Sequence, residues 1–444
     1  MTIATKINDL KNRQGFMRYF KNTSWLMGEK ILRMIVGLFV GIWVARYLGP
    51  EQFGLLSYAQ AFVAFFTVIA SFGLDGILVR ELVKDSTKRD ALMGTVFRLK
   101  LVGALLTLSF LAVAVNLMDQ DEQTSLLMFA IASATVFQSF NVIDFYFQAN
   151  VLSRYVVFAN VIGLLFSSIV KIALILNNAP LVYFGYAILF DSVVLSAGFL
   201  YFYLQKGFFI KHWFFDRQLA ISLLKDSWPL ILGGAFLMVQ ARLDQVMIKE
   251  MVSSAEVGQY SVALRLVEVF GFVPMLLKNS LFPAIQSAKN VSNELYHNRL
   301  LNFYRLNFVL FLVTAIPIFM FAEKIVTLLF GVEYKAAGVL LALMSSRLFF
   351  ANMGVARGAF IMSENMMKFS LITMMLGTAT NVTLNYIWIA EYGAKGAIMA
   401  TIISFFVTIF AVDWFYYKTR KNVKLQLLGV LTFFKLLRWK NNVS

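Results

Sequence analysis

The sequence predicts an all-α membrane protein with about twelve transmembrane helices in two six-helix bundles. Apolar residues make up 59% of its 444 residues and charged residues only 14%, whereas a soluble domain carries roughly 25% charged residues. The apolar residues fall into about twelve stretches, each close to the ~20 residues that a helix needs to cross a bilayer. Features of the first half also recur in the second, which indicates two related bundles.

The expected spans follow one another with short polar connections. The first comes after a basic segment, is as long as a full span and has no clear small-residue cleavage site, so we interpret it as a retained helix rather than a signal peptide. The spans are expected at residues 24–46, 53–79, 92–117, 125–150, 156–177, 181–204, 227–249, 257–283, 305–322, 337–362, 369–390 and 394–417.

This interpretation divides the chain into five regions. An N-terminal segment (1–23) precedes the first six-helix bundle (24–204), a linker (205–226) leads to the second bundle (227–417), and a basic tail (418–444) follows. The tail interleaves basic residues with leucines and phenylalanines. Two interpretations of it stay open: an interfacial helix on an anionic leaflet, or a solvated tail that serves only topology.

Basic residues are distributed unequally between the two sides of the expected membrane. When the residues at the very ends of the spans are counted with the connections, 25 Lys and Arg fall on the side that holds both termini and five on the other side. Because cytoplasmic loops carry the excess of Lys and Arg, we expect a cell inner (cytoplasmic) membrane protein with both termini in the cytoplasm. The same distribution accounts for the net charge of +16, so no nucleic-acid partner is expected.

The internal repeat is visible in the segments that open corresponding helices. Trp25 near the start of the first span corresponds to Trp228 in the seventh, at an offset of 203 residues, and Gly54 in the second corresponds to Gly258 in the eighth, at an offset of 204. Two parallel halves of six helices are typical of secondary transporters, whose substrate site lies between the halves.

The residues that several enzyme classes need are missing. The chain has no cysteine and only two histidines, His212 and His297, which excludes disulfides, thiol chemistry and the usual zinc sites. It also has no Walker phosphate-binding sequence, no G-x-S-x-G elbow and no H-E-x-x-H sequence. We therefore expect no enzyme, no metal and no resident cofactor.

Ionisable side chains within the spans are the candidate functional residues, because each is costly in hydrocarbon and normally faces a hydrated interior. At about 1.5 Å of rise per residue, Arg33, Arg265 and Arg347 are expected near mid-membrane. The outer third is expected to hold Lys171, Arg242 and Asp244. Four further cations lie near the cytoplasmic helix ends and are expected to reach the headgroups: Arg98, Lys100, Lys278 and Arg357.

The deep cations suit an anionic ligand, since arginine forms forked hydrogen bonds to phosphate. The candidate substrate-binding residues are thus Arg33, Arg265, Arg347, Arg242 and Lys171. For two of them a structural role stays open. Glu29 and Arg33 (i, i+4) and Arg265 and Glu268 (i, i+3) are spaced to form ion pairs on one helix face.

Motifs along nearly the whole chain resemble the Wzx-type polysaccharide flippases, the polysaccharide transport family of the multidrug/oligosaccharidyl-lipid/polysaccharide exporter superfamily. The first half contains GEKILR (28–33), ARYLGPEQFG (45–54) and FGL (72–74). The second half contains WP (228–229), DQVM (244–247), VGQYS (257–261), FPAI (282–285), FGVEY (330–334), NVTLN (381–385) and YGAKGA (392–397).

This resemblance implies both a fold and a function. The implied fold is a V-shaped transporter like the MATE proteins, with two six-helix bundles around a cationic cavity. The implied activity is translocation of an undecaprenyl-diphosphate-linked oligosaccharide, usually an O-antigen repeat unit, to the periplasmic leaflet, with lipopolysaccharide biosynthesis as its setting. The polymerase and chain-length proteins of that pathway are the implied partners, beside membrane lipids.

The resemblance further implies coupling to an ion gradient, and our hypothesis is alternating access. Binding of H⁺ or Na⁺ would bias the inward–outward equilibrium, with Asp244, Glu268, Asp191 and Glu29 as the candidate coupling residues. Two alternatives remain. One is a MATE-like, cation-coupled drug exporter. The other is a membrane-embedded polysaccharide polymerase or acyltransferase, which would need a large periplasmic loop or a catalytic histidine.

Overall fold

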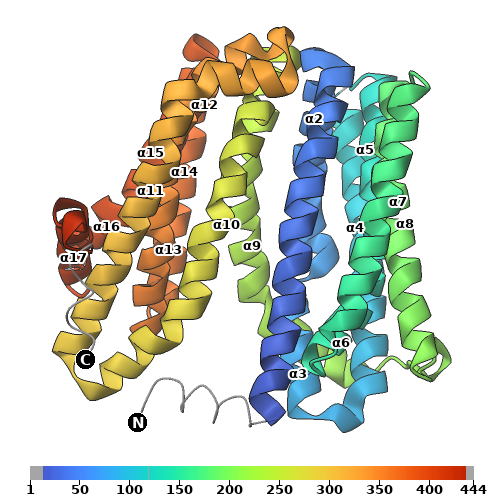
Figure 1. Cartoon of the computed structure of the whole chain (residues 1–444). Coiled ribbons are helices and arrows are strands. Elements are labelled where there is room, and N and C mark those ends of the chain that lie inside the picture. The colour runs from blue at the N-terminus through green and yellow to red at the C-terminus, as the bar shows by residue number, and fades with distance from the viewer. Residues whose placement is uncertain (1–13, 119, 437–444) are drawn as a thin grey trace. The chain divides into compact units, whose positions relative to one another are not determined.

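The computed structural model describes residues 14–118 and 120–436, with side chains described from Ser24 onward. Residues 1–13 of the expected N-terminal segment and 437–444 of the expected tail lie outside this part of the chain. Every regular element in the described part is a helix (Figure 1). The helices form two compact units. Unit 1 runs up to Tyr47 and resumes at Ala59–Met238, and unit 2 consists of Leu48–Tyr58 and the chain from Val239 onward.

The helices of unit 1 include a long first helix that enters unit 2 for eleven residues and returns. They are α2 (Gln14–Ser71), α3 (Asp75–Lys84), α4 (Arg89–Leu117), α5 (Glu122–Gln138), α6 (Val142–Ala149), α7 (Ser153–Leu176), α8 (Leu181–Gln205) and the first part of α9 (Arg217–Met251), with short turns η1 (Ser86–Lys88), η2 (Ser139–Asn141) and η3 (Ile210–His212).

Unit 2 contains the rest of α9 and the helices that follow it. They are α10 (Ser254–Val291), α11 (Asn293–Phe330), α12 (Lys335–Ser345), α13 (Arg347–Ser363), α14 (Met367–Tyr392), α15 (Ala394–Phe406), α16 (Val412–Phe415) and α17 (Arg420–Leu431), with the 3₁₀ turn η4 (Val332–Tyr334) and the π-helical turn η5 (Val407–Ala411).

Ten segments of the described chain are long and apolar enough to cross a membrane, so this is a multi-pass membrane protein. The first of them, Ser24–Lys84, holds two of the twelve expected spans, because α2 is two helices joined at a kink. The kink lies at Gly49, whose φ of 68° suits glycine, and Pro50 follows it. The expected span at 369–390 forms α14, which is not among the ten and carries Asn381 and Asn385.

The internal repeat has a structural counterpart inside unit 2. The repeat-related glycines Gly54 and Gly258 lie where α2 and α10 touch through their backbones. A Cβ atom on Gly54 would lie 1.8 Å from the carbonyl oxygen of Ser254, and one on Gly258 would lie 2.0 Å from that of Pro50. Both positions therefore require glycine, because any side chain would force the two helices apart.

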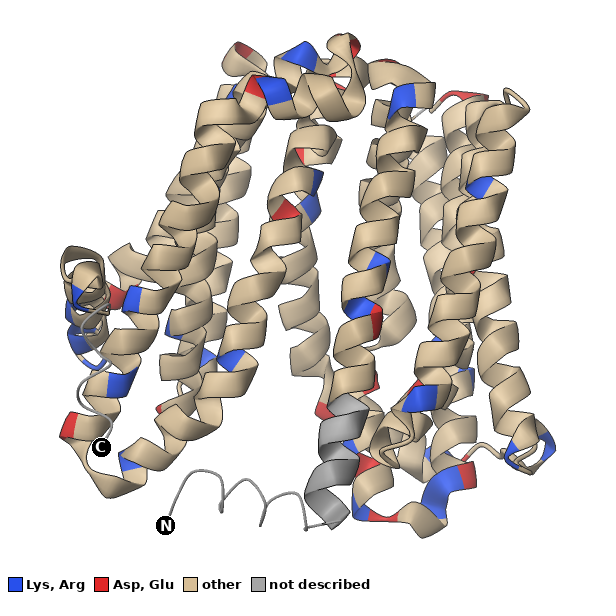
Figure 2. Cartoon of the chain, in the orientation of Figure 1, with Lys and Arg blue, Asp and Glu red and all other residues tan. Residues whose placement is uncertain are grey.

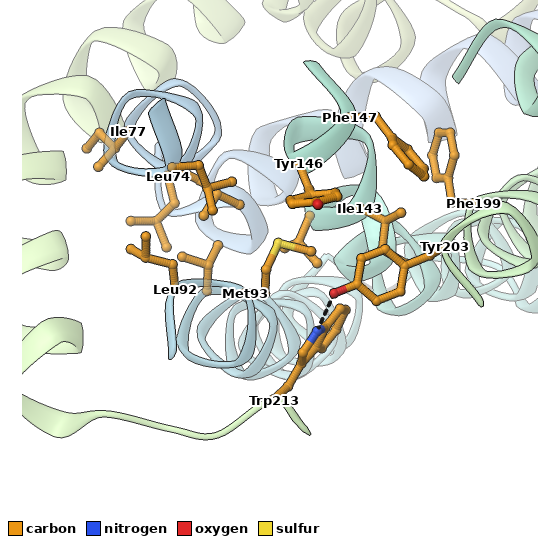
Figure 3. Close-up of a cluster of buried hydrophobic side chains, with 14 of the residues drawn as sticks. Leu74, Ile77, Leu92, Met93, Ile143, Tyr146, Phe147, Phe199, Tyr203 and Trp213 are labelled. Carbon is orange, nitrogen blue, oxygen red and sulfur yellow. Dashed lines mark hydrogen bonds between the residues drawn. The ribbon is translucent and has the colours of Figure 1, made fainter. Parts of the chain in front are cut away.

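The core of unit 1 includes part of the expected linker (Figure 3). Trp213, in the connection between α8 and α9, is only 7% exposed and donates a hydrogen bond from Nε1 to the hydroxyl oxygen of Tyr203 at 3.0 Å. From Arg217 the chain is already α9, and unit 1 extends to Met238. Residues 205–226 are thus built into unit 1, and the units divide at places other than the expected ranges 24–204 and 227–417.

The core of unit 2 joins α10, α11, α13 and the tail helix α17. Asn422 and Gln426 of α17 are fully buried, and Asn422 accepts a hydrogen bond from the hydroxyl of Tyr304 on α11 at 2.7 Å. Residues 420–431 of the tail are therefore a packed helix. The other face of this helix is exposed, with Arg420, Lys421, Lys424, Leu427, Leu428 and Leu431, and its placement on a membrane surface stays a prediction.

Candidate functional site

Charged residues lie mainly near the ends of the long helices, with fewer along their middles (Figure 2).

Asp244 lies in a buried cage of neutral hydrogen-bond donors in unit 2. Its side chain sits on α9 and the residue is 3% exposed. One carboxylate oxygen accepts hydrogen bonds from the hydroxyls of Tyr260 (α10, 2.5 Å) and Thr401 (α15, 2.8 Å), and the other accepts one from the side-chain amide of Asn385 (α14, 2.7 Å). Three helices thus supply donors to a single carboxylate.

A second layer extends this cage along α14. Asn381 donates to the hydroxyl of Thr401 at 3.3 Å and accepts from the amide of Asn385 at 3.3 Å. The side-chain oxygen of Asn385 is buried and has no hydrogen-bond partner in the described part of the chain. Nor does any described Lys or Arg lie within ion-pair distance of Asp244.

This arrangement could hold a cation. Burying a carboxylate in a region of low dielectric is costly unless a positive charge accompanies it. Hydroxyl and amide oxygens beside a carboxylate form the all-oxygen set that hard cations prefer, and a proton on Asp244 would neutralise the same group. The cage therefore fits either Na⁺ or H⁺. No group of three or more acidic, His or Cys side chains that would hold a metal occurs within residues 14–118 and 120–436.

Arg242 and Glu268 form an ion pair between α9 and α10, with a distance of 3.5 Å between a guanidinium nitrogen and a carboxylate oxygen. Both side chains are partly exposed, at 34% and 45%. The spacing of Arg265 and Glu268 allowed a pair on one helix face, but the carboxylate of Glu268 is instead nearest to an arginine of the neighbouring helix.

Arg265 and Arg347 each lie over an aromatic ring and form no salt bridge with a described carboxylate. The guanidinium of Arg265 lies 5.6 Å from the ring centre of Phe53, and that of Arg347 lies 5.3 Å from the ring of Phe405. Neither arginine has an ion-pair partner among the described residues. Arg347 opens α13 just after the break with α12 at Ser346. Both side chains are partly buried, so unit 2 holds two arginines that form no salt bridge with a described acid, although Glu268 lies close enough to Arg265 to act on it electrostatically.

In unit 1, Lys171 forms an ion pair with Asp191. Its ammonium nitrogen on α7 lies 2.7 Å from a carboxylate oxygen of Asp191 on α8 and 2.7 Å from the hydroxyl of Ser167. Spacing along the sequence did not indicate this pair, because Asp191 lies 20 residues away on the next helix. This ion pair weakens the case for Lys171 as a residue waiting for an anionic ligand.

Glu29 and Arg33 form the expected pair along α2. Nε of Arg33 donates to the Glu29 carboxylate at 2.6 Å, and a terminal nitrogen of the guanidinium contacts the same oxygen. The Glu29 side chain is 3% exposed, whereas that of Arg33 is 50% exposed. The glutamate is thus buried under its partner, and the arginine keeps an open side.

Two cations expected to reach the headgroups are buried instead. Arg357 forms a forked pair with Asp413, with distances of 2.8 and 2.7 Å and side-chain exposures of 6% and 0%. Lys100 lies 2.7 Å from a carboxylate oxygen of Asp75, and its side chain is also 6% exposed. The expectation that these two side chains extend to the membrane surface was wrong, because each has an acidic partner on another helix.

Comparison with known proteins places the chain in a family. The model of the family described as "Polysaccharide biosynthesis protein" matches residues 19–289, more than half of the chain. The chain belongs to the polysaccharide biosynthesis protein family. This confirms the family resemblance read from its motifs. A curated relative, the probable low-salt glycan biosynthesis flippase Agl15 of Haloferax volcanii, is 23% identical over 178 residues, which cover 40% of this chain and 37% of that protein.

Solved structures establish the fold of this family member. An inward-facing MATE family multidrug resistance transporter of the MOP superfamily matches with a TM-score of 0.69 at 17% identity, covering 93% of this chain and 96% of that one. The lipid II flippase MurJ, in an inward closed conformation, matches with a TM-score of 0.65 at 16% identity, covering 94% and 93%. A MOP superfamily transporter of Pyrococcus furiosus, with a binding pocket of reversed polarity, matches with a TM-score of 0.52 at 15% identity, covering 95% of each chain. The expected all-α, MATE-like fold is therefore confirmed.

Sequence reasoning selected Asp244 but not the residues that surround it. Asn381 and Asn385 are one helical turn apart on an otherwise apolar span. Such a pair of amides was the one feature of the sequence that could have indicated these two residues. Tyr260 and Thr401 gave no comparable signal, because a single tyrosine or threonine in a span is common. Only the packing of four helices shows that these side chains converge.

Proposed function

We propose that this protein is a flippase. It moves an undecaprenyl-diphosphate-linked oligosaccharide, such as an O-antigen repeat unit, from the cytoplasmic to the periplasmic leaflet of the inner membrane by alternating access. Both termini lie in the cytoplasm, as the distribution of basic residues favours. Family membership supports this proposal, and so do the fold and the flippase functions of the similar proteins Agl15 and MurJ. The protein performs no covalent chemistry in this scheme.

The observation that carries the proposal is the pair of arginines in unit 2 that form no salt bridge with a described acid. Arg265 and Arg347 are partly buried within the helices of a membrane domain and contact rings rather than acids. A guanidinium keeps its charge in proteins, and without a salt bridge these two residues are available to bind an anion from outside. A diphosphate is such an anion, and its oxygens match the forked donors of arginine. Phe53 and Phe405 leave those donors unused, because a ring face accepts the cation without taking its N–H groups.

The other cations act differently in this scheme. Arg242 is held by Glu268 and Lys171 by Asp191, so the anion would have to compete with a carboxylate at each. We assign them to secondary contacts that exchange partners as the protein changes state. Arg33, half exposed beside Glu29, keeps an open side and belongs with the primary anion contacts.

Asp244 is the proposed coupling residue. Its carboxylate is surrounded by neutral donors and lacks a described basic partner, so binding of H⁺ or Na⁺ changes the net charge of the cage. Glu268, Asp191 and Glu29 already have basic partners, which makes them weaker candidates for a cation that must bind and leave. A cation that binds more tightly to one of the inward- and outward-facing conformations shifts the equilibrium between them. We propose that the cage around Asp244 binds the cation more tightly in one of these conformations.

The test uses a strain that lacks the gene and carries variants of it. We expect Arg265→Ala and Arg347→Ala to abolish surface polysaccharide and to leave lipid-linked oligosaccharide inside the cell, with the protein at normal levels. Arg154→Ala is the matched control, because Arg154 also lies over a ring, that of Tyr155 at 4.7 Å, but is exposed. Normal surface polysaccharide in both site variants would contradict the proposal.

A drug exporter is the alternative that the MATE-like fold favours. It predicts that loss of the gene changes sensitivity to toxic cations and leaves surface polysaccharide intact. A polymerase or acyltransferase predicts instead that short, unprocessed oligosaccharide still reaches the periplasmic leaflet when the gene is deleted. The leaflet in which the lipid-linked oligosaccharide accumulates therefore separates the three functions.

A further inference from the structure

An open groove lies between α2 and α7 within unit 1, and it belongs to none of the sites described above. It has a volume of about 390 Å³ and is lined by Ser24, Trp25, Gly28, Glu29, Leu32, Val157 and Val161. The α2 residues lie one turn apart along one helix face, as do the two valines of α7. The ring of Trp25 forms one wall with Phe158, at 5.8 Å between ring centres.

Gly28 opens this groove. A Cβ atom built on it would meet nothing within 4 Å, so here glycine is not required by a neighbouring backbone, in contrast to Gly54 and Gly258. Glycine in a helix interior costs roughly 1 kcal/mol relative to alanine. The small size of Gly28 leaves space between α2 and α7, and a large side chain at this position would fill the groove.

The lining fits a hydrocarbon chain better than water. Its walls are apolar or aromatic, and Ser24 and Glu29 are its polar members. The volume is about a dozen times the roughly 30 Å³ of one water molecule in the liquid, enough for a run of methylene-sized groups. Water in such a space would have too few polar partners, whereas in a membrane the surrounding lipid supplies hydrocarbon directly.

The charges beside the groove indicate which lipid chain it holds. Glu29 is neutralised by Arg33, whose half-exposed guanidinium keeps further N–H donors beyond those bound to the carboxylate. Lys30, the next residue after Glu29, is exposed as well. Glu29 and Asp144 lie near Arg33 and offset these charges, but the N–H donors of Arg33 and Lys30 remain available, and a diphosphate offers them more acceptor oxygens than a phosphodiester headgroup does. The charge distribution places this end of α2 in the cytoplasmic leaflet, where the proposed cargo begins its passage.

We propose that the α2–α7 groove binds the polyprenyl chain of the cargo lipid, with the diphosphate held at Arg33 and Lys30. This inference rests on the proposed function and adds a loading site to it. The polyprenyl chain stays in the groove of unit 1. The groove thereby sets the position of the diphosphate before the sugar moves toward Arg265 and Arg347.

The chain offers a matched pair of substitutions as a test. Gly28→Leu fills the groove, and Gly37→Leu places the same side chain elsewhere on α2, also where a Cβ atom meets nothing within 4 Å. Both changes replace glycine by a better helix former, so both proteins are expected to fold, which size-exclusion chromatography of the purified proteins checks. The probe is a polyprenyl diphosphate with a photoreactive group on its chain, added to the full-length protein in phosphatidylcholine nanodiscs.

We expect photoadducts within residues 24–32 and 157–161, mapped by peptide mass spectrometry. Their yield should fall about tenfold in Gly28→Leu, a change equivalent to about 1.4 kcal/mol, fall in Arg33→Gln, and stay unchanged in Gly37→Leu. Unlabelled polyprenyl diphosphate should compete with the probe, and phosphatidylglycerol at the same excess should not.

Three outcomes would overturn the inference. Equal yields in Gly28→Leu and Gly37→Leu would show that the groove does not hold the chain. Equal competition by phosphatidylglycerol would make it a site for ordinary phospholipid. Competed labelling confined to residues outside the groove would refute the groove as the binding site but would not contradict the flippase function. No competed labelling anywhere in the protein would contradict the flippase function itself.

Discussion

Replacing Asp244 by asparagine separates its coupling role from its structural one. The amide has the same size, and its oxygen can take the place of the carboxylate oxygen that accepts from Tyr260 and Thr401. Its NH₂ group would then face Asn385, whose own side-chain oxygen has no described partner and can accept after the amide turns. The three hydrogen bonds to residue 244 are thus replaceable, at the loss of the long 3.3 Å bond from Asn385 to Asn381, and we expect the free energy of unfolding to change by about 1 kcal/mol.

Leucine at the same position gives the contrasting magnitude. Asp244→Leu removes the acceptor for three buried donors, and each unsatisfied donor costs roughly 1–3 kcal/mol, or roughly 3–9 kcal/mol together. That loss is comparable to the whole stability of many proteins, about 5–15 kcal/mol. We therefore expect Asp244→Leu to be poorly folded and Asp244→Asn to be folded.

Thermal unfolding of the purified proteins is the assay for cation binding. A ligand that binds only the folded state at 100 times its dissociation constant stabilises it by about 2.7 kcal/mol. The wild-type protein should therefore melt at a higher temperature as Na⁺ is raised, and Asp244→Asn should lose that response. A wild-type melting temperature independent of Na⁺, or a response retained in Asp244→Asn, would refute Na⁺ binding at Asp244.

Three further predictions concern the frame around these sites. Arg357→Met should lower the free energy of unfolding by about 3–5 kcal/mol, because it leaves the buried Asp413 unpaired, and the added change Asp413→Leu should restore most of that loss. Denaturant titration measures the stability of both variants. A double variant no more stable than the single one would contradict the argument. Trp213→Ala should cost about 3–5 kcal/mol and expose residues 205–216 to limited proteolysis, so an unchanged digestion pattern would speak against the packing of this connection. Gly258→Ala should lower the melting temperature strongly, since its Cβ atom would lie 2.0 Å from a backbone carbonyl oxygen, whereas Gly271→Ala, with nothing within 4 Å, should not; equal effects would argue against close backbone contact at Gly258.

Local features of the sequence predicted the fold well. Hydrophobic length alone located the spans, because a bilayer fixes the length of a helix. The sequence predicted a boundary between the spans 24–46 and 53–79, and the kink of α2 at Gly49 falls within it. The repeat was readable from Gly54 and Gly258 because close helix contact leaves room for no other residue.

The charges were harder to predict, because their partners come from other helices. Depth along a helix suggested that Arg357 would extend to the headgroups, but its partner Asp413 lies 56 residues away. Lys171 looked unpaired for the same reason. The pair of Glu29 and Arg33, one turn apart, was predictable. Side chains within one turn can be matched from sequence, whereas contacts between helices depend on packing that one sequence does not reveal.

Reconstitution of the purified protein tests the central claim most directly. Proteoliposomes are prepared with a polyprenyl-diphosphate-linked oligosaccharide, and the fraction open to a glycosidase added outside is followed over time. We predict that the wild-type protein makes the inner-leaflet fraction accessible when an H⁺ or Na⁺ gradient is imposed, and that Arg265→Ala and Arg347→Ala do not. Equal accessibility in liposomes with and without the wild-type protein would contradict the account.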